Sequence, residues 1–351
     1  MNLIFQIILR VLKIFCFDFS FLFLIKYKYS KSKKIHLFYK QTLKEFKQLA
    51  FIMDNQNLKT LVKAGVGGIS LLGIGLLALR QFQEKLIYIP TFGGMPKSPK
   101  DNPFGDRTPR DMNLAYEDVS TVTKDNVTLR GWLIKQKDHM NKPTVVFFHE
   151  NAGNIGLRLY YFQKYMKHTG VNILAFAYRG YSDSDDAPID EPGLQKDSLA
   201  IIEYAFRSGK INPNNVFFHG RSLGGAVLTY GLTHSLENKP NGIILENTFT
   251  SLDDMVDVVF RPVSIFKRLI LKNHWPTINQ MSKVQVPALF IKSNKDELVP
   301  ASQMQQLFDK CHSPNKHLYV IENGTHNDNW TLDILDYFKH VHEFINKYSN
   351  L

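Results

Sequence analysis

The chain has 351 residues, of which 44% are hydrophobic, as expected for a globular protein with one large domain. Its net charge of +11 is concentrated at the N-terminus: residues 1–63 hold 12 Lys and Arg against 3 Asp and Glu, whereas the rest holds 31 against 29. A basic, nucleic-acid-binding body is therefore excluded. The two cysteines, Cys16 and Cys311, are too few for a disulfide framework or a cysteine-based zinc site.

Residues 1–60 form a basic arm, and residues 61–80 are predicted to be a transmembrane anchor. Residues 64–79 carry no charge, and Lys63 and Arg80 stand at the two ends of this run. Its length just reaches the roughly 17–25 residues that a helix needs to span a bilayer. A buried helix of a soluble domain is the alternative, but this segment has no polar face and precedes the domain.

Residues 1–25 are partly apolar, and the sequence leaves their role open among a second span, a signal-like segment and an extension upstream of a start at Met53. Eight lysines lie between residues 26 and 47, before the predicted anchor. Because basic segments favour the cytosolic side, we expect a single-pass type II membrane protein whose body is luminal or extracellular. Sequons at Asn126 and Asn329 are compatible with this orientation, whereas the lack of disulfides argues against it.

Residues 81–351 are predicted to form one α/β domain. Two stretches of alternating polarity, 115–123 and 127–135, flank a polar turn and indicate an antiparallel hairpin. Short apolar runs then alternate with helical stretches, which predicts a mostly parallel sheet covered by helices on both faces. The expected strands are 144–148, 172–178, 216–218, 242–245, 288–292 and 318–321, and the expected helices are 157–168, 192–207, 226–236, 301–310 and 332–347.

Residues 259–284 do not fit this alternation and are predicted to form a small helical cap inserted before the strand at 288–292. We expect its large apolar side chains either to pack the insert onto the body or to line an apolar entrance above the strand ends. The second interpretation favours substrates with long acyl chains. These side chains are Phe260, Phe266, Leu269, Ile270, Leu271, Trp275 and Met281.

The sequence around Ser222 indicates a nucleophilic serine. Gly220 and Gly224 flank it in a Gly-x-Ser-x-Gly pattern, after the apolar run 216–218 and before a helix. A tight strand-to-helix turn needs residues without a Cβ on both sides of the serine. The turn exposes the hydroxyl oxygen and directs the amide of Leu223 to where an oxyanion forms. An ordinary glycine-rich loop fits the same five residues, so the other strand ends must decide.

Polar residues follow three other predicted strands at their carboxyl ends, where the sites of open parallel sheets lie. Asn151 follows one of them, and its amide is the predicted second oxyanion donor. Asp296 follows another, with Glu297 as the neighbouring competitor, and His326 follows the last strand after a glycine turn. His149, at the same strand end as Asn151, is interpreted as a structural histidine that braces its loop.

The order Ser222, Asp296, His326 is the order of the catalytic triad in chains with this strand–turn–helix serine. A free serine hydroxyl is a poor nucleophile. His326 would take its proton, while Asp296 would hold the imidazole tautomer and stabilise the imidazolium. Three suitable residues at three strand ends make a stronger signal than the serine pattern alone.

Five motifs match a known family: HENAGNIG at 149–156, YRGY at 178–181, GRSLGGAV at 220–227, ENTF at 246–249 and GTHNDNW at 324–330. Through them the chain resembles alpha/beta-hydrolase domain-containing protein 13 and its membrane-anchored relatives, over roughly residues 81–345. The resemblance implies an alpha/beta-hydrolase fold behind a single-pass anchor, the triad Ser222, Asp296 and His326, and no metal or cofactor. Distant relatives of similar build remove palmitate from protein cysteines, so long-chain thioesters are candidate substrates.

The chain departs from the family pattern in two places. Glu150 stands where the family usually has glycine, beside the predicted oxyanion donor Asn151. A carboxylate there opposes a developing negative charge unless it is paired or points to solvent. Ser182 and Asp183 replace a Gly-Lys pair after YRGY. Neither departure changes the predicted fold.

The sequence therefore predicts a membrane-anchored serine hydrolase that cleaves carboxylic esters or thioesters through an acyl-enzyme. A serine peptidase of similar architecture is the rival enzyme, although such peptidases usually carry a large extra domain for which residues 81–351 leave no room. A binding or signalling protein that keeps the fold without turnover is the rival from another class. A damaged triad would favour that rival, and the three residue types are all present.

Overall fold

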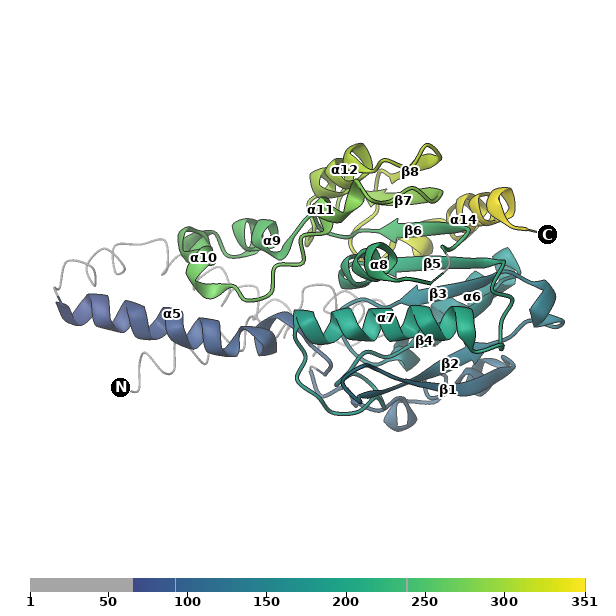
Figure 1. Cartoon of the computed structure of the whole chain (residues 1–351), viewed down its shortest axis with the longest axis horizontal. Helices are drawn as coiled ribbons and strands as arrows, with labels where there is room; N and C mark the ends of the chain where they lie inside the picture. The colour runs from purple at the N-terminus through teal and green to yellow at the C-terminus, as the bar shows by residue number, and fades with distance from the viewer. Residues whose placement is uncertain (1–65, 92, 238, 351) are drawn as a thin grey trace, which may run out of the picture. The chain divides into compact units, whose positions relative to one another are not determined.

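The computed structural model describes residues 66–91, 93–237 and 239–350 (Figure 1). These residues fall into two compact units. The larger unit, called the body here, contains the described residues of 90–252 and 275–351. The smaller, called the helical unit, contains the described residues up to Ile89 together with the inserted segment Asp253–His274.

The body is built on one sheet. Its strands are β1 (Tyr116–Val122), β2 (Thr128–Ile134), β3 (Thr144–Phe148), β4 (Asn172–Phe176), β5 (Val216–Arg221), β6 (Gly242–Glu246), β7 (Ala288–Ser293) and β8 (Lys316–Ile321). Within the described residues these form an eight-stranded sheet in the order β1-β2-β4-β3-β5-β6-β7-β8 (Figure 1). β1 and β2 form the expected hairpin, β2 pairs antiparallel with β4, and the other pairs are parallel. The predicted mostly parallel α/β sheet is confirmed.

Helices cover both faces of this sheet. The α-helices of the body are α6 (Leu159–Thr169), α7 (Glu191–Arg207), α8 (Leu223–His234), α11 (Thr277–Met281), α12 (Ala301–Lys310), α13 (Asn329–Leu332) and α14 (Ile334–Tyr348), and its 3-10 helices are η1 (Pro99–Asp101), η2 (Pro109–Met112), η3 (His139–Asn141) and η4 (Ile155–Arg158). α7 and α8 pack together on one face, and α6 and α14 pack together on the other (Figure 1).

Two adjacent phenylalanines of β3 explain this two-sided arrangement. The ring of Phe147 packs against Tyr161 of α6, with centroids 5.7 Å apart, whereas the ring of Phe148 packs 5.7 Å from Phe218 on the opposite face. Phe218 in turn contacts Phe206 of α7. Successive residues of a strand point to opposite faces, so a continuous apolar run buries side chains under both helical layers.

β5 is longer than the sequence predicts. It ends at Arg221, whereas the apolar run that predicts it ends at residue 218. Its ladder with β6 continues until Arg221 lies opposite Glu246. Sheet pairing uses backbone groups, so polar side chains do not end it. The extension places the charged residue Arg221 directly before Ser222 in the chain. Its partner across the ladder, Glu246, is also charged.

The inserted segment differs from the predicted insert, 259–284. Residues 275–284 belong to the body, where Trp275 and Met281 are 2% and 0% exposed. The amide of Trp275 donates a hydrogen bond to the carboxylate of Glu191, at the start of α7 (3.0 Å). For these two side chains the packing interpretation holds, because residues buried to this degree do not line an open entrance.

The helical unit joins α5 (Val66–Ile87) to the inserted segment, whose helices are α9 (Leu252–Val259), η5 (Arg261–Phe266) and α10 (Lys267–Ile270). Polar side chains of α5 bind the backbone of α10 and of the residues that follow it. Gln83 Nε2 donates to the carbonyl oxygen of Ile270 (2.7 Å), and Gln83 Oε1 accepts from the amide of Lys272 (2.8 Å). Arg80 Nη1 donates to the carbonyl oxygen of Leu269 (2.8 Å). The polar end of α5 is thus a docking face for the insert.

The predicted anchor at 61–80 overlaps the first part of α5, but residues 61–65 lie outside the described residues. The basic arm 1–60, with Cys16 and Met53, lies outside them as well. Within the part of the chain that the structure describes, no helix is both long enough and apolar enough to span a membrane. The anchor stays a prediction.

Candidate active site

Ser222 lies in a sharp turn between β5 and α8. Its backbone angles, φ 51° and ψ −122°, are ones that a residue other than glycine adopts only when the surroundings enforce them. Its amide donates to the carbonyl oxygen of Glu246 (2.9 Å), and its carbonyl oxygen accepts from Thr248 Oγ1 (2.7 Å) and from the amide of Gly225 (2.9 Å). These three hydrogen bonds hold the strained turn.

The glycines of the motif are required by close backbone contacts. A Cβ on Gly224 would lie 1.9 Å from the carbonyl oxygen of Phe148, and a Cβ on Gly220 would lie 2.5 Å from that of Gly224. The end of β3 therefore lies directly against the first turn of α8. As a result, the loop that carries Asn151 begins beside the helix start that carries the Leu223 amide.

The three residues of the predicted triad come together from three strand ends. His326 Nε2 lies 3.0 Å from Ser222 Oγ, and His326 Nδ1 lies 2.8 Å from Asp296 Oδ2. Ser222 is 7% exposed, His326 is 2% exposed, and the Asp296 side chain is 2% exposed. The hydrogen-bond pattern assigns the tautomer with a proton on Nδ1, which leaves the Nε2 lone pair facing the serine hydroxyl.

Asp296, and not its competitor Glu297, is the carboxylate at the imidazole. Asp296 Oδ1 accepts hydrogen bonds from the amides of Leu298 (2.9 Å) and Val299 (2.7 Å), which fix the carboxylate in the turn after β7. Glu297 Oε2 instead accepts from the backbone amide of His326 (3.1 Å). The two neighbouring acids therefore hold the same histidine through its ring and through its backbone.

The two predicted oxyanion donors have different surroundings. Leu223 is the first residue of α8, where amides lack an intrahelical partner and the helix dipole favours negative charge. The side chain of Asn151 is held by Tyr181, whose hydroxyl donates to Asn151 Oδ1 (2.8 Å). The direction of the Asn151 amide toward an oxyanion stays a prediction.

Glu150, the departure from the family pattern, is paired. Its Oε1 lies 3.2 Å from Nε of Arg158, which also donates to the carbonyl oxygens of Ala152 and Asn154. Burial alone raises the pKa of the Glu150 carboxyl, but the positive charges of Arg158 and Arg221 outweigh it and lower that pKa to about 2. The carboxylate is therefore charged and compensated.

His149 has the surroundings of a structural histidine. It is 1% exposed, and its ring stacks on Tyr178 with centroids 3.9 Å apart. Its Nδ1 lies 2.7 Å from the carbonyl oxygen of Glu150, and its Nε2 accepts from the amide of Tyr178 (3.3 Å). Burial lowers its pKa to about 3, so the ring is neutral near neutral pH.

Sequence reasoning missed Arg221 and Glu246 as parts of the site. They are 6% and 0% exposed, and Arg221 Nη2 donates to the carbonyl oxygen of His326 (3.0 Å). Both residues stand in the quoted motifs, at the ends of buried apolar strands. A buried charge needs a partner of opposite sign. The two opposite charges at the ends of apolar strands could therefore have predicted that Arg221 and Glu246 pair near the site.

The two sequons differ in accessibility. Asn126 is exposed in the turn between β1 and β2. Asn329 is 1% exposed and donates to Glu246 Oε1 (2.9 Å). Glycosylation needs an accessible amide, so Asn329 is not an acceptor in the folded protein.

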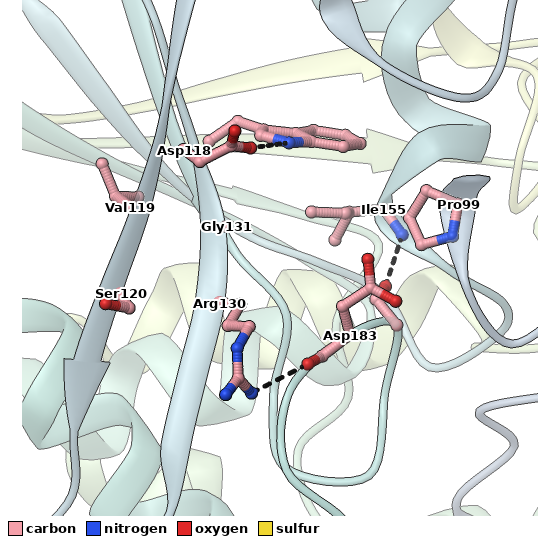
Figure 2. A pocket seen from close by; sticks show the side chains of 10 residues that line it. Pro99, Asp118, Val119, Ser120, Arg130, Gly131, Ile155 and Asp183 are labelled. Atoms are coloured by element: carbon pink, nitrogen blue, oxygen red, sulfur yellow. Dashed lines mark hydrogen bonds between the residues drawn. The ribbon is translucent and has the colours of Figure 1, made fainter.

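A hollow of about 300 Å³ lies along the β1–β2 hairpin, and no triad residue lines it (Figure 2). Two of its polar pairs already satisfy each other: Trp132 Nε1 donates to Asp118 Oδ1 (3.1 Å), and Arg130 Nη1 donates to the carbonyl oxygen of Asp183 (3.0 Å). The hollow is therefore not counted as part of the candidate site.

Curated proteins of plants and fungi are similar to the chain, although no family model matches it. It is 34% identical over 298 residues to Alpha/beta hydrolase domain-containing protein WAV2 of Arabidopsis thaliana, covering 81% of this chain and 94% of that protein. It is 32% identical over 284 residues to Protein bem46 of Schizosaccharomyces pombe, covering 80% and 92%. An uncharacterized membrane protein of Saccharomyces cerevisiae is 30% identical over 271 residues, covering 76% and 90%.

Solved structures share the fold at lower identity. The Pyrococcus furiosus esterase Pf2001 matches with a TM-score of 0.57 and 20% identity, covering 73% of this chain and 100% of the esterase. An acylaminoacyl peptidase of Pyrococcus horikoshii matches with a TM-score of 0.52 and 19% identity, covering 67% of this chain but 42% of the peptidase. These likenesses concern the fold alone.

We predict that His149 contributes a decrease in the free energy of unfolding as the pH falls below about 6.5. The pKa of His149 is depressed on folding, so its contribution is fully present above the unfolded pKa of 6.5 and is lost as the pH falls toward about 3. Between about pH 7 and pH 5 this loss amounts to about 2 kcal/mol. Urea unfolding at several pH values measures it. Glu150 and Glu246, with pKa values lowered from 4.5 to about 2, add a further loss below about pH 4.5.

The matched variant is His149→Gln, which keeps a donor and an acceptor but does not titrate. Between about pH 7 and pH 5 its free energy of unfolding should lack the loss of about 2 kcal/mol that the wild type owes to His149, while the decrease below pH 4.5 persists. Other groups that titrate in this range, such as Asp197, whose pKa burial raises to about 6, are common to both proteins and cancel in the difference. Equal pH dependence of the two proteins between pH 7 and pH 5 would contradict the assignment to His149.

Proposed function

The chain belongs to the family of alpha/beta hydrolase domain-containing proteins, and from this we propose that it is a serine hydrolase of the ester or thioester class. The observation that carries the proposal is the hydrogen-bonded series Ser222–His326–Asp296 beside a strained strand-to-helix turn. Structural neighbours that are esterases support a hydrolase, among them Pf2001 and an acetyl xylan esterase of Paenibacillus.

Acylation follows from this geometry. As Ser222 Oγ attacks the acyl carbon, His326 Nε2 accepts the hydroxyl proton, and Asp296 stabilises the resulting imidazolium through Nδ1–H. The amides of Leu223 and Asn151 donate to the oxyanion, and each such donor contributes about 3–4 kcal/mol in measured cases. The tetrahedral intermediate then collapses, and His326 returns the proton to the departing alcohol or thiol.

Deacylation repeats these steps with water as the nucleophile. His326 takes a proton from the water as its oxygen attacks the acyl carbon, and the proton passes to Ser222 Oγ when the acid leaves. None of these steps needs a metal or a cofactor. The negative charge of Glu150 is compensated by the positive charge of Arg158, which reduces its repulsion of the oxyanion.

The rival readings are discriminated by specific observations. An esterase is favoured over a peptidase, because the match covers 100% of the esterase Pf2001 but 42% of the acylaminoacyl peptidase that shares the fold. A non-catalytic binding protein is less favoured, because all three groups of the hydrogen-bonded series are present and in contact. Cleavage of acyl peptides rather than esters would reverse the first judgement.

We also propose that the chain is held at a membrane through residues 61–80, with the body on the luminal or extracellular side. The run 64–79 has no charge, and Ile74 and Leu77 of α5 are 62% and 67% exposed. The similar Saccharomyces cerevisiae protein is named a membrane protein. The excess of basic residues before this segment favours the type II orientation.

Replacing the nucleophile tests the proposed chemistry. Ser222→Ala should abolish labelling by a fluorophosphonate probe and lower kcat on a short acyl ester by a factor on the order of 10⁴–10⁶. Ser120→Ala, which removes an exposed hydroxyl of β1, is the control and should be labelled like the wild type. Full labelling of Ser222→Ala would sink the proposal.

The substrate class is tested with acyl thioesters of increasing chain length. We expect kcat/KM to rise from about four carbons to eight or beyond, because each buried methylene contributes about 0.8 kcal/mol, or roughly 3 kcal/mol for four. The measurement is the initial rate on thioesters that share one thiol. If acetyl esters are the best substrates and longer chains only lower the rate, the long-chain assignment is wrong.

Protease treatment of sealed vesicles tests the orientation. The body should be protected, and the exposed Asn126 should carry a glycan that Asn126→Gln removes. The readout is fragment size with and without detergent and with a glycosidase. Digestion of the body without detergent reverses the orientation, and recovery of the chain in the soluble fraction after lysis contradicts the membrane assignment.

A further inference from the structure

A buried network of four residues, called the loop clamp here, joins the strand ends around Ser222 to the loop 324–329 that carries His326. The clamp consists of Arg221, Glu246, Asn247 and Asn329. We propose that Arg221 and Glu246 are positioning residues, which set the distance between Ser222 Oγ and His326 Nε2. The inference rests on the proposed function, because it assigns these charges a role in proton transfer between that serine and that histidine.

The first part of the clamp holds the backbone of His326. Its carbonyl oxygen accepts from Arg221 Nη2 (3.0 Å) and from Asn247 Nδ2 (3.2 Å). Asn247 Nδ2 also lies within hydrogen-bond distance of the carbonyl oxygen of Thr325 (3.2 Å), while its Oδ1 accepts from the amide of Ser293 (3.1 Å). The His326 carbonyl therefore has a donor for each of its two lone pairs.

The second part holds the loop three residues later. Glu246 Oε1 accepts from Asn329 Nδ2 (2.9 Å), and Glu246 Oε2 accepts from the hydroxyl of Tyr337 (2.8 Å). Asn329 Oδ1 in turn accepts from Ser293 Oγ (2.5 Å). The loop is consequently fixed at His326 and again at Asn329.

Arg221 and Glu246 each contact both sides of the reacting pair. Arg221 precedes Ser222 in the chain and donates to His326. Glu246 accepts the Ser222 amide through its backbone oxygen (2.9 Å) and holds Asn329 through its side chain. Arg221 Nε lies 3.7 Å from Glu246 Oε1, and the two residues are opposite each other on β5 and β6. The contacts of these two residues thus link the nucleophile turn to the histidine loop.

Stability alone does not account for this pair. Removing two charges from water costs several kcal/mol for each ion, and apolar residues of similar volume often replace a buried ion pair without loss of stability. Placement of reacting groups does account for it, because a displacement of about 1 Å lowers enzymatic rates about 100-fold. Arg221 has a further acidic neighbour in Glu150, so its charge is balanced from two sides.

The test is the double variant Arg221→Met with Glu246→Gln, which removes both charges and keeps an acceptor for Asn329. We expect its thermal midpoint to stay within a few degrees of the wild type. We expect kcat on a short acyl ester to fall about 10–100-fold with KM within about 2-fold, because only the distance between the reacting groups changes. Amide hydrogen exchange in residues 324–329 should accelerate, while the strands exchange as before.

The matched control lowers stability without touching the clamp. Phe344 is 5% exposed and packs on Phe217, near the opposite end of β5 from Ser222. Phe344→Ala should lower the thermal midpoint, yet keep kcat near the wild-type value at temperatures where it is folded. Stability and rate should therefore change independently in the two proteins.

Wild-type kcat and wild-type exchange of residues 324–329 in the double variant would overturn the inference. If that variant does not fold, Arg221→Lys decides, because lysine keeps the charge but lacks the planar fork that reaches Glu246 and His326 together. Reduced kcat at unchanged KM supports the inference in that case, and wild-type kcat overturns it.

The proposed function fails by a different result. If the fluorophosphonate probe does not label the wild-type protein, the proposal that it is a serine hydrolase is wrong. The exchange rates of residues 324–329 still decide whether Arg221 and Glu246 hold the loop, since that measurement needs no turnover.

Discussion

The site depends on one backbone constraint, the strained conformation of Ser222 with its positive φ of 51°. Hydrogen bonds to Glu246, Thr248 and Gly225 hold this strained residue. These contacts offset the free-energy cost of the strained backbone conformation. Gly224 makes the conformation possible, because its missing Cβ lets the end of β3 lie against α8. Once the turn is formed, the hydroxyl, the Leu223 amide and the loop after β3 converge on one region.

Buried charge is the second feature that shapes the site. Arg158 pairs with Glu150 and Arg221 pairs with Glu246, so two positive and two negative groups lie in the body close to the serine turn. Each carboxyl keeps a pKa of about 2 despite burial, because the arginines outweigh the cost of desolvation. Compensation within these pairs lets the chain carry a glutamate beside the predicted oxyanion donor.

Local pattern was enough for much of this protein. Apolar runs of strand length that alternate with helical stretches predict the parallel sheet, because burial under two helical layers makes a strand apolar on both faces. The Gly-x-Ser-x-Gly pattern predicts that Ser222 stands in a tight strand-to-helix turn, since only residues without a Cβ fit on either side of it. The order of polar residues at strand ends predicts that Asp296 and His326 meet Ser222, because parallel strands end at one edge.

Tertiary contacts decided what local pattern does not encode. Arg221 and Glu246 meet because two strands are neighbours, and strand pairing depends on backbone partners far apart in sequence. Trp275 stands in the apolar segment that is predicted to be a cap, yet it is buried in the body. Gln83 follows an apolar helical run, yet it binds the insert about 190 residues later. Sequence by itself determined the alternation of strands and helices, the serine turn and the three residues of the predicted triad. The fold decided which charges and polar groups are buried together, because burial and pairing belong to the packed chain.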